Sequence, residues 1–279
     1  MDSGQLAVWV LFVLGLLIGS FLNVVIHRLP IMLEQAWAQE YKDLQNDAVP
    51  VSPVFNLVAP RSRCPHCNHA ITWYENIPVF SYLVLRGRCS ECKKPISLRY
   101  PLVEICTGLL FAWCGHRWGL STVALAWCGF TAALVALTLI DWDTTLLPDD
   151  ITLPLVWAGL VAAYWGISGI SLSSSLWGAI VGYVSLWSVY WLFKLATGKE
   201  GMGYGDFKLL AGLGAWFGWE ALLPIILMSS IIGAVVGIAL KLNSKLREGG
   251  YIPFGPFLSG AGLVTLIFGT DTTRHWVGI

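Results

Sequence analysis

The stretch "GMGYGDFKLL", residues 201–210, decides how this chain folds, because a glycine-rich turn runs directly into an apolar segment. Asp206 lies at that junction. A charged carboxylate beside a membrane helix is costly, so its presence predicts a function. Gly203 and Gly205 leave the backbone before Asp206 without Cβ cover, which allows an extended peptide to lie against it by strand addition.

The composition is that of a membrane protein. Hydrophobic residues make up 56% of the 279 positions and charged residues only 12%, whereas a soluble domain averages about 25% charged residues. Fifteen tryptophans and 29 glycines agree with this class, because aromatic belts and close helix packing both occur in bilayers. We expect the lipid bilayer, and no nucleic acid, among its partners.

Eight segments are apolar enough for membrane helices, each of which needs about 20 residues. They are 6–26, 102–118, 122–140, 151–167, 174–193, 207–219, 221–240 and 254–268. The sixth and seventh can instead form one bent hairpin around Pro224, which would reduce the number to seven. The sequence therefore predicts an all-α polytopic membrane protein with about eight transmembrane helices.

Lys and Arg residues predict the orientation of these helices, because they concentrate in cytoplasmic loops. With the amino terminus outside, all of the 17 basic residues fall inside except Arg117 and Arg274. We therefore expect the amino terminus outside and the long hydrophilic loop, 28–100, in the cytoplasm.

That loop contains two Cys-x-x-Cys pairs, "CPHC" and "CSEC", separated by 21 residues. Two such pairs can place four thiolates around one tetrahedral Zn²⁺. Disulfides are an alternative that a reducing cytoplasm disfavours, and His66 and His69 are alternative ligands. We predict a structural zinc in a small cytoplasmic zinc-binding domain inserted after the first helix, bound by Cys64, Cys67, Cys89 and Cys92.

Acidic residues gather where the third predicted helix meets the fourth, in "LTLIDWDTTLLPDD", residues 137–150. Asp149 and Asp150 follow Pro148, and we expect at least one of them to cap the fourth helix. Asp143 faces another way from Asp141 and is expected to cap or hydrate the turn. Asp141 and Asp206 are then two acids at cytoplasmic helix ends, at the same depth.

Two carboxylates that share a site can hold one proton between them, as in aspartic proteases. The ionised member takes a proton from water while the protonated member hydrogen-bonds the scissile carbonyl. A proton-coupled carrier is the main alternative, because paired intramembrane acids also relay protons. A zinc-dependent scaffold, in which the acids are structural, is a third hypothesis.

Five motifs resemble, in the same order, those of the type IV prepilin peptidases, the GxGD aspartic proteases of bacterial pilus and type II secretion systems. They are "GSFLNVVIHRLP", "CPHC…CSEC", "ISLRYPLVE", "LIDWDTTLLPD" and "GMGYGDFKL". The resemblance implies an inner-membrane endopeptidase that cleaves the basic leader from prepilins and pseudopilins at the cytoplasmic face. Asp141 and Asp206 would be its catalytic pair, although Asp143 and Asp149 also match family positions.

The resemblance has further implications. The family often N-methylates the new amino terminus with S-adenosylmethionine, and the four cysteines resemble its bifunctional branch. The use of S-adenosylmethionine is inferred from the resemblance alone, and its binding residues stay unassigned. A peptidase without methyl transfer is therefore an alternative. Gly203, Gly205 and Lys208 would support the catalytic pair.

Two polar residues have two interpretations each. Asn23 is a site residue or a polar contact between helices. Glu104 receives the new amino terminus of the substrate, or it is a buried ion pair or cap.

Gly15 and Gly19 form a Gly-x-x-x-Gly pair, which predicts a packing face. The predicted division is 1–27 for the first helix, 28–100 for the zinc-binding loop domain and 101–279 for the transmembrane peptidase core.

Overall fold

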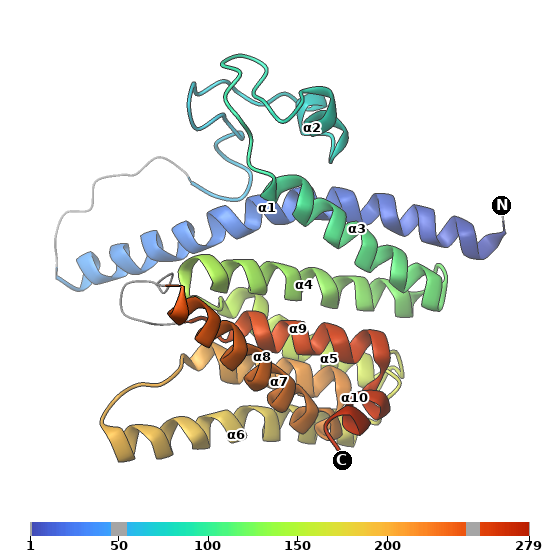
Figure 1. Cartoon of the computed structure of the whole chain (residues 1–279), viewed down its shortest axis with the longest axis vertical. Helices are drawn as coiled ribbons and strands as arrows, with labels where there is room; N and C mark the ends of the chain where they lie inside the picture. Colours follow the sequence, from blue (N-terminus) through green and yellow to red (C-terminus); the bar gives the residue numbers. More distant parts are fainter. Residues whose placement is uncertain (1, 46–54, 244–251, 279) are drawn as a thin grey trace. The chain divides into compact units, whose positions relative to one another are not determined.

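The computed structural model describes residues 2–45, 55–243 and 252–278, and the regular elements among them are all helical (Figure 1). Contacts divide the chain into two compact units, Met1–Ala136 and Leu137–Ile279. The helices are α1 (Ser3–Leu44), η1 (Tyr74–Asn76), α2 (Phe80–Val84), α3 (Arg99–Trp118), α4 (Thr122–Thr144), α5 (Asp149–Tyr164), α6 (Leu172–Thr197), α7 (Tyr204–Phe217), η2 (Trp219–Ala221), α8 (Leu222–Leu242), α9 (Gly255–Phe268) and α10 (Thr270–Trp276).

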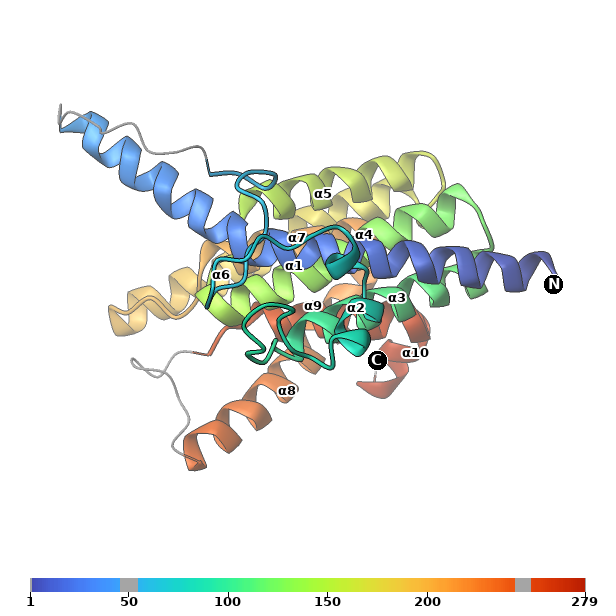
Figure 2. The same cartoon turned by 90° about the horizontal axis from the view of Figure 1, so that it is seen from above.

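Helix α1 is twice as long as the apolar segment that predicts it. It has 42 residues and continues through Pro30. A proline inside a helix removes a backbone donor and bends the axis, and Figure 2 shows α1 changing direction. Arg28 is buried beside this point, where it donates to the carbonyl oxygens of Asn56 (2.9 Å) and Pro60 (2.6 Å). The loop domain is therefore tied to α1 next to the bend.

Helices α1 and α3 pack along one another, and the predicted glycine face makes this contact. A Cβ atom on Gly15 would lie 2.7 Å from the Cα atom of Gly108, and one on Gly19 would lie 2.7 Å from the Cα atom of Glu104. The backbones approach so closely that only glycine fits, as in small-xxx-small helix pairs. The prediction of a packing face is confirmed.

Helix α7 is the core of the second unit. It contacts α5, α6 and α9, and every residue from Leu209 to Phe217 is buried, as expected for a helix that is apolar all round. Its partners also satisfy polar groups: Ser175 on α6 donates to the carbonyl of Ala215 (2.6 Å), and the Trp216 indole donates to the carbonyl of Leu155 (2.9 Å).

Among the residues that the structure describes, four helices are long and apolar enough to cross a membrane. They are Ser3–Leu44, Thr122–Thr144, Leu172–Thr197 and Trp219–Leu242, with Gly255–Phe268 as a shorter apolar helix. The chain is thus a helical membrane protein, and the number of eight spans stays a prediction. The bent hairpin around Pro224 is not formed, because Gly218 and η2 separate α7 from α8 and Pro224 lies in the first turn of α8. The three-part division of the chain also stays a prediction.

Candidate active site and metal module

The four cysteines of the loop domain form one cluster. Their Sγ atoms all lie within 4.8 Å of one another, with 3.8 Å between Cys64 and Cys92 and 3.9 Å between Cys67 and Cys89. A tetrahedral Zn²⁺ with Zn–S bonds of about 2.3 Å places its sulfur ligands about 3.8 Å apart. The cluster therefore fits a four-thiolate metal site. His69 is not part of it.

The two Cys-x-x-Cys pairs have the same backbone conformation. In each pair the N–H of the first cysteine, Cys64 or Cys89, donates to the carbonyl five residues later over 2.9 Å. Asn68 and Lys93, each four residues beyond the first cysteine, have φ angles of 57° and 58°. The module is thus a structural repeat, and its two halves share in sequence the cysteines, the preceding arginines Arg63 and Arg88, and the isoleucines Ile71 and Ile96.

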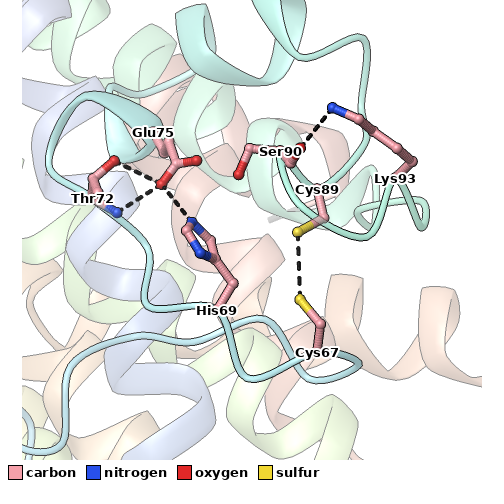
Figure 3. Close-up of polar contacts among 7 residues, drawn as sticks. All are labelled: Cys67, His69, Thr72, Glu75, Cys89, Ser90 and Lys93. Atoms are coloured by element: carbon pink, nitrogen blue, oxygen red, sulfur yellow. Dashed lines mark hydrogen bonds and ion pairs between the residues drawn. The ribbon is translucent and has the colours of Figure 1, made fainter.

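Glu75 connects the two halves of this module (Figure 3). Its Oε2 atom accepts hydrogen bonds from the Thr72 N–H (2.8 Å) and hydroxyl (2.6 Å), and it lies 3.2 Å from Nε2 of His69. The Ser90 hydroxyl, beside Cys89, and the Thr72 donors together lower the pKa of Glu75 to about 2. The ionised carboxylate therefore bridges the loops that carry the two cysteine pairs.

The second unit brings together the acids that the sequence singles out. Asp141 lies in the last turn of α4 and Asp206 in the first turn of α7, and their exposed fractions are 4% and 7%. Their carboxyl groups are close enough to interact electrostatically. Two buried carboxyl groups placed together are unfavourable for stability alone, which makes the pair a functional-site candidate.

Three helix ends converge on this pair. The Oδ2 atom of Asp141 accepts a hydrogen bond of 2.9 Å from the backbone N–H of Gly255, the first residue of α9. The side chain of Leu147, in the turn after α4, packs against both Gly205 and Gly255. A Cβ atom on Gly205 would lie 2.5 Å from its Cβ atom, and one on Gly255 would lie 3.2 Å from its Cδ1 atom. Gly203 differs, because no atom lies closer than 3.9 Å to its Cβ position. Only Gly203 therefore keeps the open backbone that the sequence predicts for both glycines.

The other acids of the 137–150 stretch lie outside this pair. Asp143 is exposed, and Asp149 forms an ion pair with Lys208 at 2.6 Å. The prediction that Asp149 or Asp150 caps α5 is wrong: the helix begins at Asp149, its cap position is Pro148, and no side chain caps it. The two carboxylates instead lie in the first turn, where the helix dipole favours negative charge.

Glu104 and Asn23 belong to the first unit. Glu104 is buried and accepts a hydrogen bond of 2.7 Å from the N–H of Val79. Val79 has a φ of 59°, which is rare for a β-branched residue, so Glu104 holds a strained turn of the loop domain. Asn23 donates to the carbonyl of Tyr100 over 3.1 Å. These contacts support the cap and the interhelical contact among the predicted alternatives.

Two of the residues described above are not among those predicted from the sequence. Gly255 precedes a proline and looks like an ordinary helix start, and it is 114 residues away from Asp141. Glu75 is one acid among several in a hydrophilic loop. Gly255 matters through a tertiary contact, which no spacing rule encodes. Glu75 joins a local Thr72-x-x-Glu75 pair, whose spacing is visible in the sequence, to the distant Ser90.

The helices, the buried acid pair and the four-cysteine module together define a class: helical membrane proteins with a buried acid pair and a loop domain whose four cysteines could hold a metal ion. Residues 13–118 match the Bacterial Peptidase A24 N-terminal domain, and residues 128–238 match the Type IV leader peptidase family.

Curated relatives extend the match over almost the whole chain. Proteins named prepilin leader peptidase/N-methyltransferase from Stutzerimonas stutzeri, Aeromonas hydrophila and Pseudomonas aeruginosa are 54%, 53% and 51% identical to it. Each alignment covers 95% of this chain and 92%, 92% and 91% of the relative. No solved structure matches significantly. The chain belongs to the type IV leader peptidase family.

Proposed function

We propose that this chain is an aspartic endopeptidase that removes the basic leader from prepilins and pseudopilins at the cytoplasmic face of the bacterial inner membrane. We further propose that it methylates the new amino terminus. The observation that best supports the peptidase activity is the buried pair of Asp141, in the last turn of α4, and Asp206, in the first turn of α7. The shared name of the relatives supports both the substrate and the methyl transfer.

In the proposed reaction one carboxyl group of the pair is ionised and the other holds a proton. The ionised group removes a proton from a water molecule whose oxygen attacks the scissile carbonyl carbon, while the protonated group hydrogen-bonds the carbonyl oxygen. The tetrahedral intermediate then collapses, the C–N bond breaks, and the leaving amine receives a proton from the pair. The free carboxylate of the leader and the free amine of the mature pilin are the products.

The surroundings of the pair suggest how a peptide reaches it. The backbone at Gly203 is exposed and no atom lies closer than 3.9 Å to its Cβ position, so an extended leader junction can approach Asp206 there. Gly205 supports the pair by letting Leu147 pack against the turn. Lys208 lies one helical turn into α7 and supports the pair through its ion pair with Asp149, the first residue of α5. Asp143 has at most a supporting role at the exposed turn.

Zinc and S-adenosylmethionine have separate proposed roles. Zn²⁺ bound by Cys64, Cys67, Cys89 and Cys92 would be structural, because four thiolates leave no position open for water. S-adenosylmethionine would supply an electrophilic methyl group to the uncharged amine, and no residue of this chain is assigned to it. Glu104 and Asn23 are proposed to act indirectly, by fixing the loop domain on α1 and α3.

The test uses purified protein and a synthetic prepilin that carries its leader, with products followed by mass spectrometry. We expect wild-type protein to release the leader and, with S-adenosylmethionine, to add 14 Da to the mature product. Asp141→Asn and Asp206→Asn should each lose about 100- to 10,000-fold in cleavage, the typical contribution of general acid–base catalysis. Asp143→Asn is the matched control and should cut normally. An intact leader with wild-type protein would refute the peptidase.

A further inference from the structure

We propose that Gly255 is a positioning residue for Asp141, and that the start of α9 is thereby the third element of the active site. This inference rests on the proposed function, because it takes Asp141 to be catalytic. Gly255 lies beyond residues 128–238, which match the leader peptidase family, and no comparison gives it a role.

The hydrogen bonds at the start of α9 single out Gly255. The first N–H groups of a helix have no partner within the helix. Pro256 has no N–H, and the N–H groups of Phe257 and Leu258 donate to the carbonyl of Phe254 over 3.1 and 3.2 Å. The Gly255 N–H instead donates to Oδ2 of Asp141 over 2.9 Å, in a buried setting. The helix thus presents one fixed donor to the carboxylate.

Steric contact restricts this position to glycine. A Cβ atom on Gly255 would lie 2.5 Å from Oδ2 of Asp141, 3.2 Å from its Cγ atom and 3.2 Å from Cδ1 of Leu147. The Asp141 contact is shorter than real Cβ atoms tolerate, so a larger residue would displace the carboxylate. A displacement of about 1 Å in a catalytic group can cost about 100-fold in rate. Gly255 therefore fixes where the carboxylate points.

The same helix offers a matched control. Gly260 lies in α9, and a Cβ atom there would meet no atom within 4 Å. Gly260→Ala therefore makes the same chemical change in the same helix without touching Asp141. Any effect that Gly255→Ala shows and Gly260→Ala lacks comes from the contact at the helix start.

The first readout separates kcat from KM. We expect Gly255→Ala to lower kcat for leader cleavage by about 10- to 100-fold, with KM within about threefold of wild type, because the substrate does not need Asp141 to bind. Gly260→Ala should leave both unchanged. Wild-type kcat in Gly255→Ala, or a loss confined to KM, would overturn the proposal.

The second readout is independent of activity. The single variant Gly255→Ala should melt at a lower temperature than wild-type protein. The double variant Asp141→Ala/Gly255→Ala should melt at the same temperature as Asp141→Ala, because that background lacks the carboxylate that the new methyl group meets. If Gly255→Ala alone fails to fold, its recovery in the Asp141→Ala background supports the contact. An equal loss in both backgrounds overturns it. Failure of the proposed function would show separately, as normal cleavage by Asp141→Asn.

Discussion

At the residue scale, the buried and half-buried acids of this chain have two different roles. Glu104 and Glu75 accept hydrogen bonds from backbone and hydroxyl donors and thereby fix loop conformation. Asp141 and Asp206 lie close enough to oppose one another electrostatically. A fold gains nothing from like charges brought together in a buried site, so the second arrangement indicates chemistry.

Glu75 leads to a prediction about pH. Its pKa in the folded protein is about 2, compared with 4.5 ordinarily. Because the folded-state pKa is the lower one, the ionised carboxylate stabilises the loop domain at pH values above about 4.5, and this contribution is lost as the pH falls toward 2. Glu75→Gln should therefore release bound zinc to a chelator faster than wild type at pH 6 to 7.

The matched control for this prediction is Glu40→Gln, because Glu40 is an exposed acid in α1, outside both loops that carry the cysteine pairs. It should release zinc at the wild-type rate. The difference between Glu75→Gln and wild type should shrink as the pH is lowered below about 4.5. Equal release by all three proteins at pH 7 would show that Glu75 does not connect the two cysteine pairs.

At the element scale, close backbone contact holds the helices together. Gly15→Ala places a methyl group 2.7 Å from the Cα atom of Gly108 and 2.8 Å from the carbonyl oxygen of Thr107. Backbone atoms cannot rotate aside, so α1 and α3 must separate. We expect a loss of about 1–3 kcal/mol in the free energy of unfolding, as for other overpacked contacts.

Tryptophan fluorescence during thermal unfolding in detergent would measure this loss. Gly4→Ala in the same helix is the control, since a Cβ atom there meets nothing within 4 Å. We expect Gly4→Ala to melt like wild type. A Gly15→Ala protein that also melts like wild type would contradict the packing described for α1 and α3.

The sequence predicts the longer helices well, because each contains a run of apolar residues. It predicts their ends less well, since the ends depend on particular contacts. The apolar segment that predicts the first helix ends at residue 26, yet α1 continues to Leu44. Asp149 suggests a cap, yet it pairs with Lys208. The cysteine cluster follows from spacing alone, whereas the roles of Glu75 and Gly255 appear only when distant segments are placed together.

At the scale of the whole molecule, the proposed topology places Asp141, Asp206 and Gly255 at helix ends on one side of the membrane. In that topology 15 of the 17 basic residues lie on the same side, which predicts it to be cytoplasmic. The amino terminus would then be periplasmic, and each acid would face the compartment in which a prepilin leader is made.

Reporter fusions would test this orientation. Alkaline phosphatase fused after Gly119, which follows α3, should be active, because that turn is predicted to be periplasmic. The same enzyme fused after Gly198, which follows α6, should be inactive, while a fluorescent protein fused there should be bright. Active phosphatase at Gly198 would reverse the topology and move the acid pair away from the leader.

The central claim is that Asp141 and Asp206 act as one catalytic unit. It is tested most directly by the initial rate of leader cleavage in Asp141→Asn, Asp206→Asn and the double variant. Residues that act as a unit have strongly non-additive effects. We therefore predict that the double variant is no slower than either single variant. Single variants with losses that multiply in the double variant, or that cut at the wild-type rate, would contradict it.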